Sequence, residues 1–164
     1  MSDLAVFFLH GLAYAGLLFL VSSGLTLVFG MMNVLNFAHA SFYMLGAYFA
    51  MAIAVYTGQF WLTLAVAPLA LLVIGAVVER FLLRKVHVLG HVHELLLTFG
   101  LAYIIQEGVK WIWGNNPQAI NVSGLLASTV HLGGIVYPVY RLFIFALSAL
   151  LGLGMALVIY KTQI

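Results

Sequence analysis

The side chains best suited to chemistry lie in one short segment, residues 33–46, which directly follows the long apolar run 4–30. Polar groups inside a bilayer are costly unless they face protein or water, so they indicate a functional pathway. Amide, imidazole and phenol groups in this segment recur at i, i+3 and i+7, positions that share one face of a helix. The predicted substrate-pathway residues are Asn33, Asn36, His39, Tyr43 and Gly46.

A second interpretation of the same segment is purely structural. Asn33 and Asn36 could cap the helix that follows, since an asparagine at the N-cap accepts hydrogen bonds from free backbone N–H groups. His39 would then be a satisfied interhelical hydrogen bonder. The two interpretations overlap, because a helix that begins inside the membrane presents a positive dipole end suited to a carboxylate.

A cluster of histidines precedes the fourth apolar run. His87, His91, His93 and Glu94 have spacings that could bring imidazoles to one metal ion. Gly90 interrupts the segment, and histidines also suit a loop at the level of the lipid headgroups. The solvated loop is favoured, so no metal site and no cofactor are predicted.

The acidic residues offer ion pairs rather than catalysis. Glu107 and Lys110, at i and i+3 near the end of the fourth run, are expected to form a structural ion pair, and Glu79 with Arg80 could pair similarly. An intramembrane serine protease is disfavoured because a nucleophilic serine needs a base on a facing element and an oxyanion hole. No catalytic residue is predicted.

The composition defines the class of protein. The chain is 65% hydrophobic and 6% charged, whereas a soluble domain typically carries about 25% charged residues. A net charge of +2 with no basic cluster among aromatics gives no support for nucleic-acid binding, and zero cysteines exclude disulfides and thiol chemistry. We expect one integral membrane domain over residues 1–164.

The hydropathy pattern predicts an all-α, polytopic transmembrane bundle. A span needs about 20 apolar residues. Arg80, Arg84 and Lys85 lie in the short connection after the third span, so the positive-inside rule makes that connection cytoplasmic and places the N-terminus in the periplasm. Lys110 and Arg141 oppose this orientation. Five stretches qualify as spans: 5–30, 37–56, 60–82, 94–113 and 141–160, with one long outer loop at 114–140.

Several features of the sequence indicate how the spans pack. Rows of small residues recur every four positions at Gly46, Ala50 and Ala54, and again at Ser148, Gly152 and Ala156, which favours close helix contacts. Three tryptophans, Trp61, Trp111 and Trp113, are expected to anchor the outer ends of their spans at the headgroup boundary. In the outer loop, turn signals occur at residues 115–117 and 133–134, and residues 136–140 resemble an extended interfacial piece.

The run from Gly24 to Tyr48, with its core Asn36-Phe-Ala-His39-Ala-Ser-Phe-Tyr43, resembles the signature of the branched-chain amino acid ABC transporter permeases of the LivH type. Similar stretches follow at 79–84, 94–103, 111–114 and 140–143. The resemblance covers essentially the whole chain in the family's order. Such permeases are usually nearly twice as long, so the chain resembles the N-terminal portion of the family.

The resemblance implies a subunit of a binding-protein-dependent importer in the bacterial inner membrane. It implies three kinds of partner: a second, homologous permease subunit, two cytoplasmic ATPase subunits and a periplasmic substrate-binding protein. No nucleotide-binding loop occurs in the sequence, so ATP hydrolysis is expected on a partner chain and this chain is expected not to be an enzyme. Two alternatives remain: a urea or short-amide permease or channel, and a truncated structural membrane subunit without independent transport.

Overall fold

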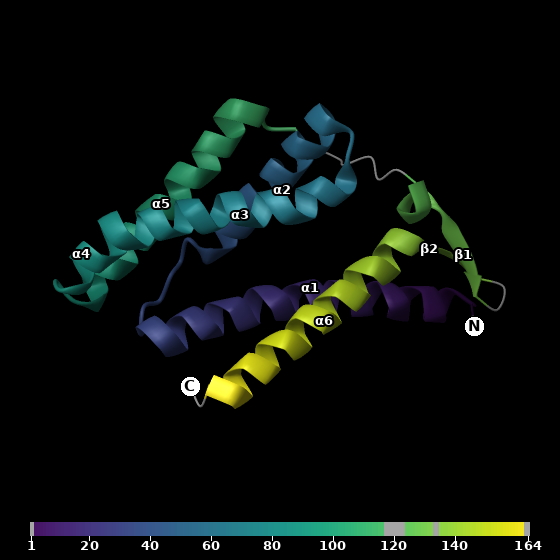
Figure 1. Cartoon of the computed structure of the whole chain (residues 1–164), viewed down its shortest axis with the longest axis horizontal. Coiled ribbons are helices and arrows are strands. Elements are labelled where there is room, and N and C mark those ends of the chain that lie inside the picture. The colour runs from purple at the N-terminus through teal and green to yellow at the C-terminus, as the bar shows by residue number, and fades with distance from the viewer. Residues whose placement is uncertain (1, 117–123, 133–134, 163–164) are drawn as a thin grey trace. The chain divides into compact units, whose positions relative to one another are not determined.

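The computed structural model describes residues 2–116, 124–132 and 135–162, and in this part of the chain it is dominated by long helices (Figure 1). Five of these helices are long and apolar enough to cross a membrane, which confirms the predicted all-α polytopic fold class. In chain order the elements are α1 (Ser2–Met32), α2 (His39–Thr57), α3 (Phe60–Val78), η1 (Glu79–Leu83), α4 (Arg84–His87), α5 (His91–Trp113), η2 (Gly124–Ala127), β1 (Thr129–Leu132), β2 (Ile135–Pro138) and α6 (Val139–Thr162).

Large apolar side chains cover the outside of the helices. Phe7 is 73% exposed and Leu96 is 68% exposed, and many other leucine, valine and aromatic side chains are similarly open. A soluble domain rarely exposes apolar patches of this extent, whereas lipid tails solvate them without cost. The membrane assignment made from composition therefore agrees with the distribution of side chains.

The chain forms two compact units: residues 31–121 make one, and residues 1–30 together with 122–164 make the other. The sequence predicted one domain, and that organisation stays a prediction. Each unit is described separately below.

In the unit 31–121, α2 and α3 lie side by side as an antiparallel pair (Figure 1). α2 ends at Gly58, whose positive φ of 65° closes the helix with a hydrogen bond from its N–H to the Ala54 carbonyl (2.9 Å). Val34, Val78 and Leu83 form a small core at the opposite end of the pair, against which Leu97 and Leu101 of α5 pack. The segment before α2 is thus part of the packed structure.

The third span is longer than the sequence indicated. The predicted end was about residue 82, but helical structure continues through η1, a π-helical turn, and through α4 to His87. Arg80, Arg84 and Lys85 therefore lie on a helix rather than in a loop. Long basic side chains permit this, because their aliphatic stems stay in apolar surroundings while their charges reach water.

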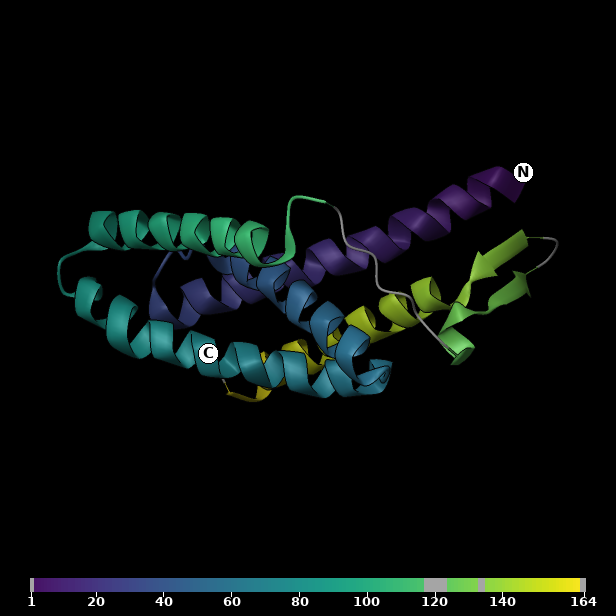
Figure 2. The same ribbon diagram turned by 90° about the horizontal axis from the view of Figure 1, so that it is seen from above.

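The other unit contains α1, α6 and a β-hairpin that the sequence did not predict (Figure 2). The hairpin directly precedes α6 in the chain. β1 and β2 pair antiparallel, with Val130 opposite Tyr137. Tyr137 is 1% exposed. The centroid of its ring lies 5.1 Å from that of His10 on α1, with the two rings tilted by 34°, and its hydroxyl lies 3.2 Å from His10 Nδ1. The extended piece expected at 136–140 is confirmed for β2, after which α6 begins at Val139.

The turn signals have mixed outcomes. Asn115 and Asn116 lie in a bend after α5. Pro117 and the pair Gly133-Gly134 lie outside the described residues.

Candidate functional site

The residues that precede α2 form a tight hydrogen-bonded turn. Asn33 is exposed and has a left-handed backbone with φ of 53°, a conformation that asparagine tolerates better than most residues. Asn36 Oδ1 accepts a hydrogen bond from the N–H of Ala38 (3.0 Å), and the Asn36 carbonyl accepts one from the N–H of His39 (3.1 Å). The capping expected of Asn33 and Asn36 is not observed: Ala38 is the N-cap residue of α2 and no side chain caps this helix, so the Asn36 side chain stabilises the preceding turn instead.

The predicted face is consequently shorter than the sequence indicated. α2 begins at His39, so Asn33 and Asn36 stand before the helix and not on it. His39 is half-buried at the first position of α2, and Tyr43 is 52% exposed one turn later. The structure brings the amide of Asn36 and the imidazole of His39 to the same end of α2, between the first two apolar spans.

Gly46 has a different role in the packing. A Cβ atom added at Gly46 would lie 2.6 Å from Leu71 Cδ1, so α3 passes directly over this position. The glycine permits the close approach of α2 and α3 that the row of small residues predicted.

A hydrogen bond and apolar contacts attach the turn before α2 to α5. Thr98, which is completely buried, donates from Oγ1 to the Leu35 carbonyl at 3.4 Å, and Val34 is 2% exposed in the small core. Side chains of α5 and of the end of α3 therefore position the backbone on which Asn36 and His39 stand.

Sequence reasoning missed the buried carboxylate of Glu94, the most buried charged side chain among those whose burial is described. Glu94 is 1% exposed, and its two carboxylate oxygens contact His87 Nδ1 and, at 3.2 Å, His91 Nδ1. The spacing of the histidines and Glu94 in the sequence indicated only a metal site or a solvated loop. Among the described residues no group of three or more acidic or histidine side chains has the geometry of a metal site. We name Glu94 with His87 and His91 the Glu94 clamp. The sequence signal for it was the spacing of the two histidines on either side of the turn at Gly90, which brings both imidazoles to one carboxylate.

The ion pairs expected from the sequence differ in outcome. Lys110 Nζ lies 2.6 Å from Glu107 Oε1, with both side chains about half exposed. Within the described ranges, no ion pair joins Glu79 to Arg80, so that expectation was wrong. Adjacent residues on a helix point to different sides, which keeps the two charges apart.

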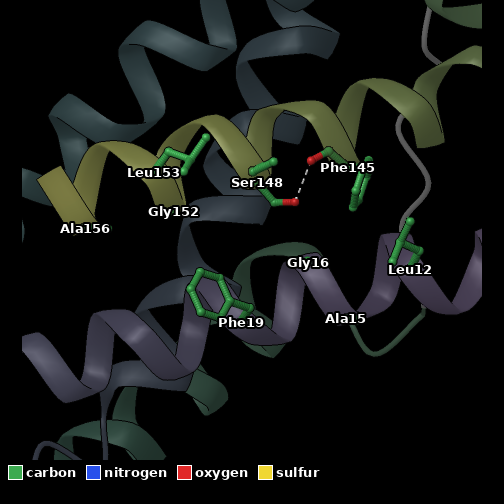
Figure 3. Close-up of a pocket in the computed structure, with 10 residues that line it drawn as sticks. Leu12, Ala15, Gly16, Phe19, Phe145, Ser148, Gly152, Leu153 and Ala156 are labelled. Carbon is green, nitrogen blue, oxygen red and sulfur yellow. Dashed lines mark hydrogen bonds between the residues drawn. The ribbon is translucent and has the colours of Figure 1, made fainter.

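A separate apolar groove of about 550 Å³ lies between α1 and α6 (Figure 3). Gly16 and Phe19 of α1 face Ser148 and Gly152 of α6, and the Ser148 hydroxyl turns back to its own helix, donating to the Phe145 carbonyl at 2.8 Å. The groove wall thus presents almost no polar atom. The row Ser148, Gly152 and Ala156 lines this approach of the two helices, as the spacing of small residues predicted.

These features define a class of protein: a multi-pass helical membrane protein with a polar turn at the end of one span. A comparison with protein families identifies the family. Residues 7–164 match the family described as the permease component of branched-chain amino acid transport systems, and the chain belongs to that family.

Two curated relatives are similar at low identity. The high-affinity branched-chain amino acid transport system permease protein BraD of Pseudomonas aeruginosa is 23% identical over 167 residues, which cover 94% of this chain and 54% of the relative. The corresponding protein LivH of Escherichia coli is 27% identical over 135 residues, covering 73% of this chain and 43% of the relative. The chain thus spans about half the length of these relatives. No solved structure matches it.

Proposed function

We propose that this chain is a permease subunit of a bacterial inner-membrane ABC importer and that it helps to move branched-chain amino acids. The family match over residues 7–164 is the observation that carries the proposal. A homologous second permease subunit, two cytoplasmic ATPases and a periplasmic binding protein complete the transporter, and ATP is hydrolysed on the partner chains. In this arrangement the N-terminus is periplasmic.

The substrate's chemistry fits the turn before α2. Leucine, isoleucine and valine present a zwitterion and an apolar branch, so a path for them needs a few oriented dipoles between apolar walls. The first N–H groups of a helix lack intrahelical acceptors, and the helix dipole favours negative charge at that end. The N-terminus of α2, with His39 at its first position, is therefore suited to receive the substrate carboxylate.

The hydrogen bonds and exposure of the turn residues support a choice among the proposed pathway residues. Asn36 Oδ1 is used by the N–H of Ala38, so its side-chain NH₂ is the group that remains for a ligand. Tyr43 offers an exposed hydroxyl one turn along α2. Gly46 lies against Leu71, and its contribution is the spacing of α2 and α3. The proposed path thus runs along Asn33, Asn36, His39 and Tyr43, with its mouth at the turn.

Uptake by reconstituted vesicles tests this proposal. The chain is purified together with its ATPase and permease partners, inserted into proteoliposomes and supplied with binding protein, ATP and labelled leucine. His39→Leu removes a polar group from the mouth and is expected to lower uptake about tenfold or more, because hydrogen bonds to charged groups contribute about 1.5–3 kcal/mol. The matched control is His93→Leu, which makes the same change at an exposed position on α5.

The outcomes separate the candidate functions. Loss of uptake in His39→Leu but not in His93→Leu, with equal assembly of both, supports the proposal. Normal uptake by His39→Leu removes the turn from the pathway. Failure of His39→Leu to assemble indicates a structural subunit, and passage of urea through liposomes that contain the chain alone indicates a channel.

A further inference from the structure

Half of the chain's lysine and arginine residues lie together at the end of the helix formed by α3, η1 and α4. Arg80 is on η1, Arg84 and Lys85 are on α4, and all three are exposed. In the described part of the chain, none of them forms an ion pair. We name these three residues the basic cluster.

The carboxylates near the basic cluster do not neutralise it. Glu94 is buried and both of its oxygens are taken by His87 and His91. Glu79 precedes Arg80 on η1 but makes no ion pair with a described cation. The basic cluster therefore presents net positive charge to whatever lies outside the protein.

The basic cluster lies at the end of a helix that is long and apolar enough to cross a membrane. The apolar stretch that begins at Phe60 ends at His87, and the next one begins at His91. Large apolar side chains stand exposed beside the cations, namely Phe81, Val88, Leu89 and Val92. Cations beside exposed apolar side chains suit the headgroup region, where phosphates meet the charges and acyl chains meet the apolar groups.

A small pocket of about 200 Å³ opens in the same place. It is lined by Val34, Glu79, Leu83, Arg84 and His87. A guanidinium binds phosphate oxygens through a planar fork of N–H donors, and a carboxylate accepts hydrogen bonds from hydroxyl groups. Arg84 and Glu79 together match a headgroup that carries one phosphate and free hydroxyls.

We propose that the basic cluster and this pocket form a binding surface for anionic phospholipid, of the phosphatidylglycerol type. The phosphate meets Arg84 and its neighbours Arg80 and Lys85, and the glycerol hydroxyls meet Glu79. This surface does not depend on the transport function, because it needs only the fold of residues 31–121.

The test compares two variants of the full chain with equal net charge. The chain has six lysine and arginine residues, so the basic cluster and the remaining three can each be replaced by glutamine. The proteins are placed in nanodiscs of mixed phosphatidylcholine and phosphatidylglycerol, and native mass spectrometry measures which lipids stay bound after transfer to detergent. The test variant is Arg80→Gln, Arg84→Gln, Lys85→Gln, and the control is Lys110→Gln, Arg141→Gln, Lys161→Gln.

Wild type and the control are expected to retain phosphatidylglycerol over phosphatidylcholine. Each cation lost from the basic cluster should lower this preference up to about fivefold, from the usual attraction of one basic residue to an anionic surface. Arg84→Gln alone is a second variant for the case that the triple variant loses helical circular dichroism. Higher salt should weaken retention by screening.

Three results would overturn the proposal. Equal loss in both triple variants would show that only net charge matters. Unchanged retention in the cluster variant would show that these three cations do not hold the lipid. Displacement of the lipid by inorganic phosphate alone would make free phosphate the ligand.

Discussion

The hydroxyl of Thr98 on α5 donates to the backbone carbonyl of Leu35 at 3.4 Å, across 63 positions of sequence. Thr98 is completely buried, and its single hydroxyl hydrogen is shared between the Leu35 carbonyl and the Leu95 carbonyl of its own helix, the latter at 3.2 Å. This contact attaches the turn that precedes α2 to a helix encoded much later in the chain. The geometry of the proposed pathway mouth therefore depends on α5.

Replacing Thr98 with valine should loosen this attachment. Valine keeps the shape of the side chain but removes the donor, so the Leu35 carbonyl loses a partner, at a cost of about 1 kcal/mol in the free energy of unfolding. Unfolding in detergent micelles, followed by far-ultraviolet circular dichroism, measures the change. The matched control is Thr26→Val, since the Thr26 hydroxyl is exposed and, among the described residues, bonds to the Ser22 carbonyl of its own helix alone. Equal effects of the two substitutions would contradict the role of Thr98.

Two substitutions at Asn36 separate its support of the turn from substrate contact. Aspartate keeps the oxygen that accepts from the Ala38 N–H, so Asn36→Asp should preserve stability, whereas Asn36→Leu loses this hydrogen bond and should cost about 1 kcal/mol. Both remove the amide NH₂, and aspartate adds a negative charge that repels a carboxylate. Leucine uptake should therefore fall in both variants. If Asn36→Asp retains normal uptake, Asn36 only stabilises the turn before α2.

The approach of α1 and α6 should not tolerate a methyl group at Gly16. A Cβ added there would fall on the Ser148 hydroxyl and lie 3.1 Å from Ser148 Cβ, so Gly16→Ala requires Ser148 to change rotamer and the two helices to shift slightly. Overpacking of this kind costs about 1–3 kcal/mol, measured by the same unfolding experiment.

A control variant and a compensating double variant test whether the contact between Gly16 and Ser148 causes this loss. Gly11→Ala adds the same methyl on α1 where nothing lies within 4 Å, and it should be neutral or stabilising. The double variant Gly16→Ala, Ser148→Gly should recover part of the loss. No recovery would mean that Gly16 matters for another reason.

Because Glu94 is buried and Glu107 is exposed, replacing each with glutamine should change the free energy of unfolding by different amounts. Glu94→Gln replaces one carboxylate oxygen that meets a histidine with an amide NH₂ and should cost about 1–3 kcal/mol in unfolding free energy, because Glu94 itself is buried and its hydrogen bonds are left incomplete. Glu107→Gln breaks an exposed pair and should have little effect, since water replaces the lost contact. Thermal unfolding of the two variants side by side gives the comparison, and equal destabilisation would argue against the clamp.

Local sequence was sufficient where a single helix decides the outcome. The predicted spans 37–56 and 94–113 agree closely with α2 and α5, because an apolar stretch of membrane-crossing length must satisfy its own backbone hydrogen bonds as a helix. The end of the third span was placed too early. Basic residues indicated a loop there, although their long stems permit a helix at the membrane surface.

The sequence by itself determined the membrane class, the helices and the polar segment before α2, since these follow from hydropathy and from periodicity within one element. Tertiary structure alone decided that Leu71 covers Gly46, that Glu94 is buried against two histidines and that the ring of Tyr137 packs against that of His10. These relationships depend on how side chains of different segments meet, and the spacing within any one segment does not encode that meeting.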